Sequence, residues 1–370
     1  MLDNKIKRIA VNTGGGDAPG LNAVIKAVVM AALNRGWEVL GIRDGYNGIF
    51  LPANYPKGDG LINLTYADVK DITSQGGTIL GTTNRGNPMK FPMKTASGDV
   101  VEVDRSDEII EGFRRHNIDA LIAIGGDGSL TMANSFAKKG LKVIGVPKTI
   151  DNDLEKTNIT FGFDTAVSFA TECIDRLHTT AEAHKRIIVV EVMGRTAGWI
   201  ALNSGISGSA DVILIPEIPY DIQKVADHLH SIFNEDKDYA IVVVAEGAMP
   251  VGGSMSVIEH EAGKEKRLGG AGERVAHELQ QLTKKEVRTA ILGHLLRGGS
   301  PTTFDRLLSL RFGAAAIRGL EEGYSGVMVA LNPPTVNYVP IDQIANKLKL
   351  VNVESDTVKT ARDLGICFGD

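Results

Sequence analysis

The chain has 370 residues, a formal net charge of −5, 43% hydrophobic residues and 23% charged residues. This length predicts two domains, and the composition is typical of a soluble globular enzyme. The weak negative charge argues against nucleic acid or a membrane surface as a partner. Two cysteines, Cys173 and Cys367, do not make a disulfide framework. Without a signal peptide or an apolar stretch of transmembrane length, we expect a cytoplasmic protein.

Strand-like and helix-like segments alternate along the chain. The sequence predicts strands at 7–12, 37–43, 120–124, 142–146, 186–192, 212–215 and 239–245, and helices at 21–35, 107–116, 131–139 and 222–234. These strands are apolar throughout, as in parallel sheets that are covered on both faces. The repeated order predicts an α/β fold with doubly wound sheets and ligands outside the carboxyl ends of the strands. Stretches 51–60, 86–104 and 247–272 are expected to be surface loops.

The first glycine-rich motif, Gly14-Gly15-Gly16-Asp17-Ala18-Pro19-Gly20-Leu21-Asn22, follows the first predicted strand and opens the first predicted helix. It matches neither the dinucleotide-binding pattern nor the Walker A loop. Glycines let the backbone approach a phosphate group closely, so we interpret the motif as a phosphate-facing turn. A purely structural turn is the alternative.

A second glycine-rich motif, Ile124-Gly125-Gly126-Asp127-Gly128-Ser129, ends another apolar strand. The N–H groups of such a turn can cradle an anion, and the helix that follows directs its positive end toward it. Asp127 is then well placed to hold a hard cation such as Mg²⁺. The alternative is a tight connection without a ligand.

The third motif, Lys148-Thr149-Ile150-Asp151-Asn152-Asp153, follows the predicted strand 142–146. Phosphoryl transfer to an alcohol needs a base for the hydroxyl proton and positive charge for the phosphoryl oxygens. Carboxylates at Asp151 and Asp153, with a lysine and a threonine beside them, provide these groups. A polar turn with a helix cap is the alternative.

Cationic residues accompany the later strand ends. Arg195 lies between glycines in Met193-Gly194-Arg195-Thr196-Ala197-Gly198, where an arginine could stabilise a transferred phosphoryl group, or form a structural salt bridge. His294 and Arg297 lie in Gly293-His294-Leu295-Leu296-Arg297-Gly298-Gly299-Ser300-Pro301. Together with Arg186 and Arg288 they would make a strong pocket for a phosphate dianion. Glu246, after the predicted strand 239–245, could bind sugar hydroxyls.

These motifs, in this order, resemble the 6-phosphofructokinase family from about Lys7 to about Gly326. The resemblance implies two α/β domains with the active site in the cleft between them. It implies transfer of a phosphoryl group from ATP to O1 of fructose 6-phosphate in glycolysis, which gives fructose 1,6-bisphosphate. Residues 1–162 with about 296–345 would form the donor domain, and residues 163–295 with about 346–370 the fructose 6-phosphate domain.

The resemblance also implies residue roles. Asp151 would act as the general base beside Thr149 and Asp153, Arg195 would stabilise the transferring phosphoryl group, and Asp127 would hold Mg²⁺. The donor would contact Gly15, Gly16, Arg85, Gly126, Gly128 and Ser129. Fructose 6-phosphate would contact Thr149, Ile150, Asp151, Arg186, Met193, Gly194, Arg195, Glu246, Arg288, His294, Leu295, Leu296 and Arg297. Counterparts of Arg186 and Arg288 come from a neighbouring subunit in bacterial members, which implies a dimer or, more specifically, a homotetramer.

Two positions give opposite indications of the donor. Gly128 resembles the ATP-dependent type, because an aspartate there would clash with the nucleotide α-phosphate and repel it. Lys148 resembles the pyrophosphate-dependent type, so the chain is similar to the mixed-substrate subgroup. We expect ATP, with the pyrophosphate-dependent transferase as the alternative. In regulated members of the family, the basic residues that bind allosteric nucleotides begin in the first helix. The first predicted helix of this chain has Lys26 and then Met30, which argues against allosteric control by effectors.

Two other functions compete with this interpretation. The Gly-Gly-Asp-Gly run also occurs in kinases for other acceptors, although the cluster of His294 and Arg297 argues against them. A sugar-phosphate sensor without catalysis would not need Asp127, Asp151 and Arg195 together.

Overall fold

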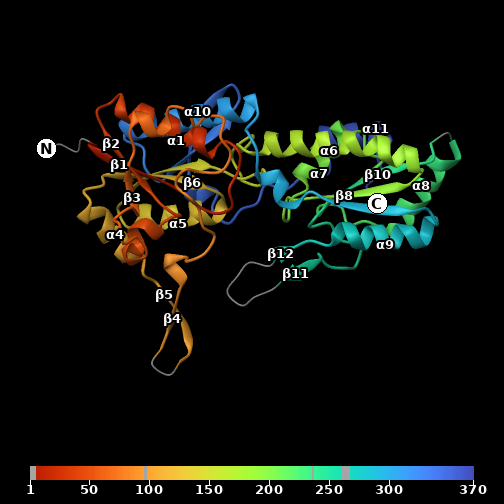
Figure 1. Cartoon of the computed structure of the whole chain (residues 1–370), viewed down its shortest axis with the longest axis horizontal. Helices are drawn as coiled ribbons and strands as arrows, with labels where there is room; N and C mark the ends of the chain where they lie inside the picture. The colour runs from red at the N-terminus through yellow and green to blue at the C-terminus, as the bar shows by residue number, and fades with distance from the viewer. Residues whose placement is uncertain (1–5, 96–97, 236, 260–266) are drawn as a thin grey trace. The chain divides into compact units, whose positions relative to one another are not determined.

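The computed structural model describes residues 6–95, 98–235, 237–259 and 267–370. Two predictions fall partly outside these ranges. The expected lack of a signal peptide rests partly on residues 1–5, and the expected loop 247–272 includes residues 260–266. The chain divides into two compact units (Figure 1). Unit 1 comprises Met1–Thr149, Leu154–Gly162 and Arg297–Lys347; unit 2 comprises Ile150–Asp153, Phe163–Leu296 and Leu348–Asp370.

Unit 1 is built on a seven-stranded sheet with the order β15-β14-β7-β6-β1-β2-β3. The strands are β1 (Arg8–Thr13), β2 (Glu38–Ile42), β3 (Leu61–Asn63), β6 (Ala120–Gly125), β7 (Lys142–Pro147), β14 (Val327–Asn332) and β15 (Thr335–Pro340). The central strands from β14 to β2 are parallel, as predicted. The edge strands β3 and β15 are antiparallel to their neighbours, which the sequence analysis did not predict.

Two layers of helices cover this sheet. Helices α1 (Leu21–Leu33) and α10 (Thr303–Glu321) share one apolar core with one face, and α4 (Ser106–Arg115) and α5 (Asp127–Lys138) share a second core with the other. Short helical segments complete the unit: α2 (Asn47–Phe50), α3 (Tyr66–Val69), η1 (Pro52–Asn54), η2 (Pro88–Lys90) and η4 (Ile341–Gln343). Helices α1 and α10 pack very closely, since a Cβ on Gly313 would lie 2.7 Å from Cβ of Ala27.

Two expectations for unit 1 were wrong. Stretch 86–104 is not only a loop, because β4 (Phe91–Lys94) and β5 (Val100–Val103) form an antiparallel hairpin (Figure 1). Phe91 at its base makes an edge contact with Phe50 at 5.1 Å between ring centroids. The predicted helix 131–139 begins earlier, at Asp127, so Gly128 and Ser129 belong to its first turn and not to an open loop.

Unit 2 is built on a four-stranded parallel sheet with the order β13-β8-β10-β9. The strands are β8 (Ile187–Val192), β9 (Val212–Leu214), β10 (Ala240–Ala245) and β13 (Val287–Ile291). The helices are α6 (Phe163–His184), α7 (Trp199–Ser207), α8 (Ile222–Glu235), α9 (Ala271–Thr283) and α11 (Asp356–Asp363). The short helix η3 (Gly293–Arg297) contains the point at which the chain passes from the segment Phe163–Leu296 of unit 2 to the segment Arg297–Lys347 of unit 1. Helix α9 lies on the face of the sheet opposite α6 and α7 (Figure 1). The long helix α6 was not predicted.

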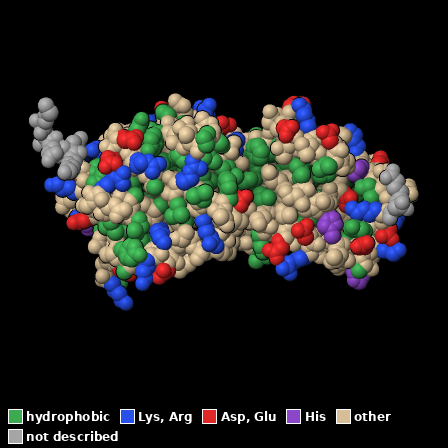
Figure 2. Space-filling view, turned by 90° about the horizontal axis from the view of Figure 1, so that it is seen from above, with side chains coloured by type: hydrophobic (Ala, Val, Ile, Leu, Met, Phe, Trp, Pro, Cys, Tyr) green, Lys and Arg blue, Asp and Glu red, His purple; other side chains and the backbone are tan. Residues whose placement is uncertain are grey.

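The expected loop 247–272 contains a second small hairpin, formed by β11 (Val257–Glu259) and β12 (Arg267–Leu268), and the start of α9. On the surface drawn in Figure 2, acidic and basic side chains are interspersed. No helix within the described ranges combines the length and apolarity needed to cross a membrane.

Candidate active site

Three predicted motifs of unit 1 lie next to one another because their strands are neighbours. Strand β6 pairs in parallel with β1 and with β7, so residues 14–16, 126–129 and 148–149 all follow the same edge of the sheet. The backbone links them directly: the N–H of Gly14 donates to Ile124 O at 2.9 Å, and that of Lys148 donates to Gly125 O at 3.0 Å. The fold therefore gathers the donor motifs at the carboxyl ends of parallel strands.

The loop around Gly15 is held from the side by residues 82–83. The N–H of Gly15 donates to Thr83 O at 3.0 Å, and the Thr82 hydroxyl donates to Gly15 O at 2.6 Å. Gly15 has φ 78°, a conformation that favours glycine. Arg85 follows on the same segment with an exposed side chain, so the segment brings this predicted donor residue close to the glycine loop.

Small residues let two of these turns approach each other. A Cβ on Gly14 would lie 2.6 Å from Oγ of Ser129, and a Cβ on Gly125 would lie 2.3 Å from Cβ of Ser129. Both distances are too short for real side chains. Ser129 is 8% exposed, so its side chain fills the space that the two glycines leave. Its contribution to the loop is therefore packing between two backbones.

Two cations lie against the first glycine loop. Lys148 is 3% exposed, and its Nζ donates to Gly16 O. The guanidinium of Arg297 packs on Gly16, where an added Cβ would lie 2.8 Å from Nη1, and it donates to Asp17 O at 3.2 Å. Glycine backbone with a lysine and an arginine beside it is a suitable environment for phosphate oxygens. Arg297, expected at the sugar phosphate, thus lies at the glycine loop of unit 1 that was predicted to bind the donor.

Asp127 and Gly128 open helix α5. The Asp127 carboxylate is partly exposed and accepts a hydrogen bond from the N–H of Asn346 at 2.8 Å. In the part of the chain that the structure describes, no three His, Cys, Asp or Glu side chains gather as a metal cage. Mg²⁺ commonly needs only one or two carboxylates plus substrate phosphates and water, so Asp127 beside a phosphate-binding loop fits it. Gly128 is exposed, and beyond its own helix an added Cβ would meet no atom of the described part of the chain within 4 Å.

The turn after β7 is buried although it is polar. Thr149 is 8% exposed, Asp151 4% and Asn152 5%. Thr149 O accepts the Thr160 hydroxyl at 2.7 Å, and Asn152 has φ 52°. Burial of carboxyl and amide groups is costly unless the surroundings compensate it. This buried turn was the site predicted for the general base. Ile150 is fully buried, backbone included, so its predicted contact with the sugar would be indirect.

In unit 2, the predicted sugar-binding residues follow three neighbouring strands. Residues 193–195 follow β8, Glu246 follows β10, and His294 follows β13, on both sides of β8 in the sheet. Glu246 Oε1 accepts the N–H of Arg195 at 2.9 Å and that of Gly194 at 3.4 Å. Arg195 has φ 52° and an exposed side chain. Glu246 thus holds the arginine loop in addition to its predicted contact with the sugar.

The backbone of Gly247 supports the same loop. A Cβ on Gly247 would lie only 2.0 Å from O of Arg195, so no other residue fits there without moving the loop. At the other end of the loop, Gly198 donates its N–H to both carboxylate oxygens of Glu217 at 3.0 and 3.1 Å. Burial raises the pKa of Glu217, although hydrogen bonds from the backbone of Gly198 and Val351 oppose this rise.

Arg186 and Arg288 do not join His294 within one chain. Arg186 precedes β8 and Arg288 is the second residue of β13, so both lie toward the amino ends of strands whose carboxyl ends lead to Met193 and His294. Both interact with Glu286, Arg288 at 2.5 Å and Arg186 at 3.7 Å. The single pocket that the sequence suggested is therefore divided between two ends of the sheet.

The adjacent leucines of η3 differ in exposure. Leu295 is 62% exposed, whereas Leu296 is 1% exposed and belongs to the core, so of the two only Leu295 is open to a ligand.

Sequence reasoning missed contacts that support the site from a distance. The sequence analysis gave no role to Glu217, Lys349 or Trp199. Lys349 Nζ donates to Asn152 Oδ1 at 2.9 Å, and the indole N–H of Trp199 donates to Lys349 O at 2.8 Å. No motif surrounds Lys349 in the sequence, so only the folded chain reveals its position.

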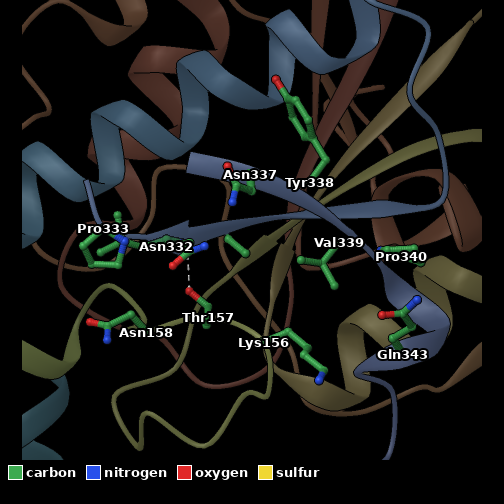
Figure 3. Close-up of a pocket in the computed structure, with 12 residues that line it drawn as sticks. Lys156, Thr157, Asn158, Asn332, Pro333, Asn337, Tyr338, Val339, Pro340 and Gln343 are labelled. Carbon is green, nitrogen blue, oxygen red and sulfur yellow. Dashed lines mark hydrogen bonds between the residues drawn. The ribbon is translucent and has the colours of Figure 1, made fainter. Parts of the chain in front are cut away.

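A hollow of about 520 Å³ in unit 1 lies apart from these residues (Figure 3). Its wall includes Lys156, Asn158, Asn332, Asn337 and Gln343. None of the predicted site residues lines it. Thr157, at its base, accepts the N–H of Leu331 at 3.0 Å and donates to Ile159 O at 3.1 Å. This hollow is therefore not the candidate active site.

Comparison with known proteins identifies the family. The family model described as phosphofructokinase matches residues 8–320. The chain belongs to the phosphofructokinase family. The ATP-dependent 6-phosphofructokinase of Chloroflexus aurantiacus is 49% identical over 369 residues, which cover 100% of this chain and 99% of the relative. The pyrophosphate–fructose 6-phosphate 1-phosphotransferase of Amycolatopsis mediterranei is 48% identical over 351 residues, which cover 94% and 97%.

Solved structures of the family share the fold. Phosphofructokinase from Pichia pastoris in the T-state superposes with a TM-score of 0.78 at 29% identity, over 98% of this chain. This chain spans 37% of that larger chain. The pyrophosphate-dependent phosphofructokinase of Marinobacter aquaeolei has a TM-score of 0.79 at 21% identity, over 97% of this chain and 91% of its own, which shows the fold alone.

Proposed function

We propose that this chain is an ATP-dependent 6-phosphofructokinase, which transfers the terminal phosphoryl group of ATP to O1 of fructose 6-phosphate. The products are ADP and fructose 1,6-bisphosphate, and the reaction is a step of glycolysis. Membership of the family over nearly the whole chain supports this, as does the name of the Chloroflexus relative. Unit 1 binds the donor and unit 2 binds the sugar phosphate.

The observation that carries the choice of ATP is the open space at Gly128. Apart from its chain neighbours and the backbone of its own helix, no atom of the described residues lies within 4 Å of a Cβ placed there. Glycine at this position is therefore not required by packing, and the free space suits the larger donor. An aspartate here would bring negative charge toward the nucleotide α-phosphate and repel it.

Pyrophosphate is the second candidate donor. It is favoured by the buried ammonium group of Lys148 at the glycine loop and by the name of the Amycolatopsis relative. The two named relatives are 49% and 48% identical to this chain, so overall identity does not decide the donor. Use of both donors would place the chain in the mixed-substrate subgroup.

In the proposed reaction, Asp151 accepts the proton of the 1-hydroxyl group while that oxygen attacks the terminal phosphorus and ADP departs. Thr149 and Asp153 assist at the same turn, and Arg195 stabilises the transferring phosphoryl oxygens. Gly15, Gly16, Gly126, Gly128, Ser129 and Arg85 form the donor site with Lys148. Mg²⁺, held by Asp127, would supply positive charge to the donor phosphates.

For the sugar phosphate, we propose contacts with Met193, Gly194, Glu246, His294 and Leu295. Ile150 and Leu296 are buried and would support the site from behind rather than touch the sugar. Arg297 was predicted to bind the 6-phosphate; because its guanidinium packs on Gly16 and donates to Asp17 O, we propose that it also serves the donor phosphates. Arg186 and Arg288 lie toward the amino ends of the strands, so we propose that they serve the 6-phosphate of a neighbouring copy in a dimer or tetramer. The side chain of Arg288 is 61% exposed and pairs with Glu286, which supports this role, whereas that of Arg186 is only 17% exposed.

The test is the rate of fructose 1,6-bisphosphate formation from fructose 6-phosphate and Mg²⁺, with ATP and pyrophosphate in parallel. We expect the wild type to turn over ATP. In Gly128→Asp the rate with ATP should fall at least about tenfold, since each 1.4 kcal/mol of repulsion lowers a rate by a factor of ten. Lys148→Gly should reduce any pyrophosphate activity more than ATP activity. Turnover with pyrophosphate alone would contradict the proposed donor, and no turnover with either would contradict the reaction.

A further inference from the structure

The turn that carries Asp151 and Asp153 contains a residue in an unfavourable conformation. Asn152 has φ 52° and is 5% exposed. Asparagine tolerates the left-handed region better than most residues, but such a residue persists only where its surroundings hold it. Because Asn152 lies between the two aspartates, its conformation sets the direction in which both carboxylates leave the backbone. Contacts that hold Asn152 therefore bear on the geometry of the proposed base.

Lys349 makes two such contacts. Its Nζ donates to Oδ1 of Asn152 at 2.9 Å, and its backbone N–H donates to O of Asp153 at 2.9 Å. One residue thus binds the side chain of the strained position and the backbone of the next. Lys349 is partly buried, and all three residues belong to unit 2. An ammonium donor makes a stronger hydrogen bond than a neutral one.

The segment that carries Lys349 is itself anchored. The indole N–H of Trp199 donates to O of Lys349 at 2.8 Å, and the ammonium lies 5.5 Å from the centroid of the Trp199 ring, within the range of a cation–π contact. Two residues further on, the N–H of Val351 donates to Oε1 of Glu217 at 2.9 Å. The carboxylate of Glu217 also holds Gly198, the N-cap residue of α7.

We propose that Lys349 is a positioning residue of the phosphoryl-transfer site: it holds Asn152 and thereby aims Asp151 at the sugar hydroxyl. This inference rests on the proposed function of Asp151. The anchors at Trp199 and Glu217 connect the segment around Lys349 to the end of the loop that carries Arg195. The residues that would take the proton and stabilise the phosphoryl group are therefore braced by one continuous set of hydrogen bonds.

Steady-state kinetics of Lys349→Met test the proposal. We expect kcat to fall by about 10- to 100-fold, the range in which a small misplacement of a reacting group acts. The KM values for fructose 6-phosphate and ATP should change much less, because Lys349 is not proposed to touch either substrate. Lys349→Arg should retain more of kcat than Lys349→Met, since it keeps a charged donor. The assays are run well below the melting temperature of each variant.

The matched control is Lys347→Met, two residues earlier. Lys347 is exposed, and its side chain makes no hydrogen bond or ion pair with the residues that the structure describes. It should keep the kcat of the wild type. A combined variant sharpens the test: in an Asn152→Gly background, which tolerates positive φ and lacks the acceptor, Lys349→Met should have little further effect on kcat.

Three results would overturn the proposal. One is an unchanged kcat in Lys349→Met. Another is a higher KM for either substrate at constant kcat, because that describes a substrate-binding cation. The third is full additivity of Lys349→Met and Asn152→Gly. An inactive wild type would instead overturn the proposed function and the positioning role with it, whereas an active wild type with an unchanged kcat in Lys349→Met overturns only the positioning role.

Discussion

The two units hold their candidate loops in different ways. In unit 1, residues 14–16 are glycines, and they are held by the backbone of Ile124 and Thr83 and by the side chain of Lys148. In unit 2, the loop of residues 193–198 is held at its two ends by the carboxylates of Glu246 and Glu217. A chain of phosphates is recognised by close backbone approach, which needs glycine. A loop that must present an arginine side chain is instead fixed from outside by acceptors on other strand ends.

If the reaction depends on side chains that unit 2 holds in a fixed position, Asp151→Asn should lower the rate more than any other substitution. We expect kcat to fall by about 10²- to 10⁴-fold, the usual contribution of a general base, with binding of fructose 6-phosphate retained. Steady-state kinetics and calorimetric titration measure the two quantities. Asp175→Asn, at an exposed carboxylate on α6, is the control and should be unaffected. A sugar-phosphate sensor would keep its function in both variants.

Mixing Asp151→Asn with an Arg288 variant tests whether the sugar-phosphate site is shared between neighbouring copies of the chain. Arg288→Ser should be poorly active by itself, and refolding it together with Asp151→Asn should restore part of the turnover if the arginine serves a neighbouring copy. Absence of any recovery in a confirmed mixed oligomer would assign Arg288 to its own chain.

A smaller effect should separate the two kinds of loop. In unit 2, Gly247→Ala places a Cβ 2.0 Å from the backbone oxygen of Arg195, so the loop must move. In unit 1, Gly16→Ala places a Cβ 2.8 Å from Nη1 of Arg297, the far end of a flexible side chain. We expect Gly247→Ala to lose about 1–3 kcal/mol of unfolding free energy in urea and Gly16→Ala less. Equal losses would contradict the comparison.

The smallest expected effect is the pH dependence that Glu217 contributes. Burial raises the pKa of this carboxyl group in the folded chain. Stability from a group with a raised pKa is fully present below the unfolded pKa and is lost as the pH rises through the folded value. Glu217→Gln removes this dependence, so the stability of the wild type relative to this variant should fall from acidic to neutral pH. Urea unfolding across that range measures it, with Glu354→Gln as an exposed control. A pH-independent difference would contradict the expectation.

Local patterns were sufficient for much of this protein. The apolar strands, the glycines after β1 and β6, and the pair Asp151 and Asp153 are visible in the sequence because each depends on neighbours a few residues away. The order of these motifs also indicated the family. The hairpin β4–β5 was missed since its strands are short, and its valines are exposed on both faces rather than alternating with polar residues.

The tertiary structure decided how distant parts of the chain are related. The sequence grouped Arg186, Arg288 and His294 around one phosphate, with the resemblance assigning the two arginines to a neighbouring subunit. Only the sheet shows that, within one chain, parallel strands direct the two arginines and the histidine toward opposite ends. Lys349 reaches Asn152 across a separation of 197 residues, and Val351 reaches Glu217 across 134. No local pattern encodes such pairs, because a hydrogen bond depends on where the backbones meet in space and not on the residues that surround each partner in the chain.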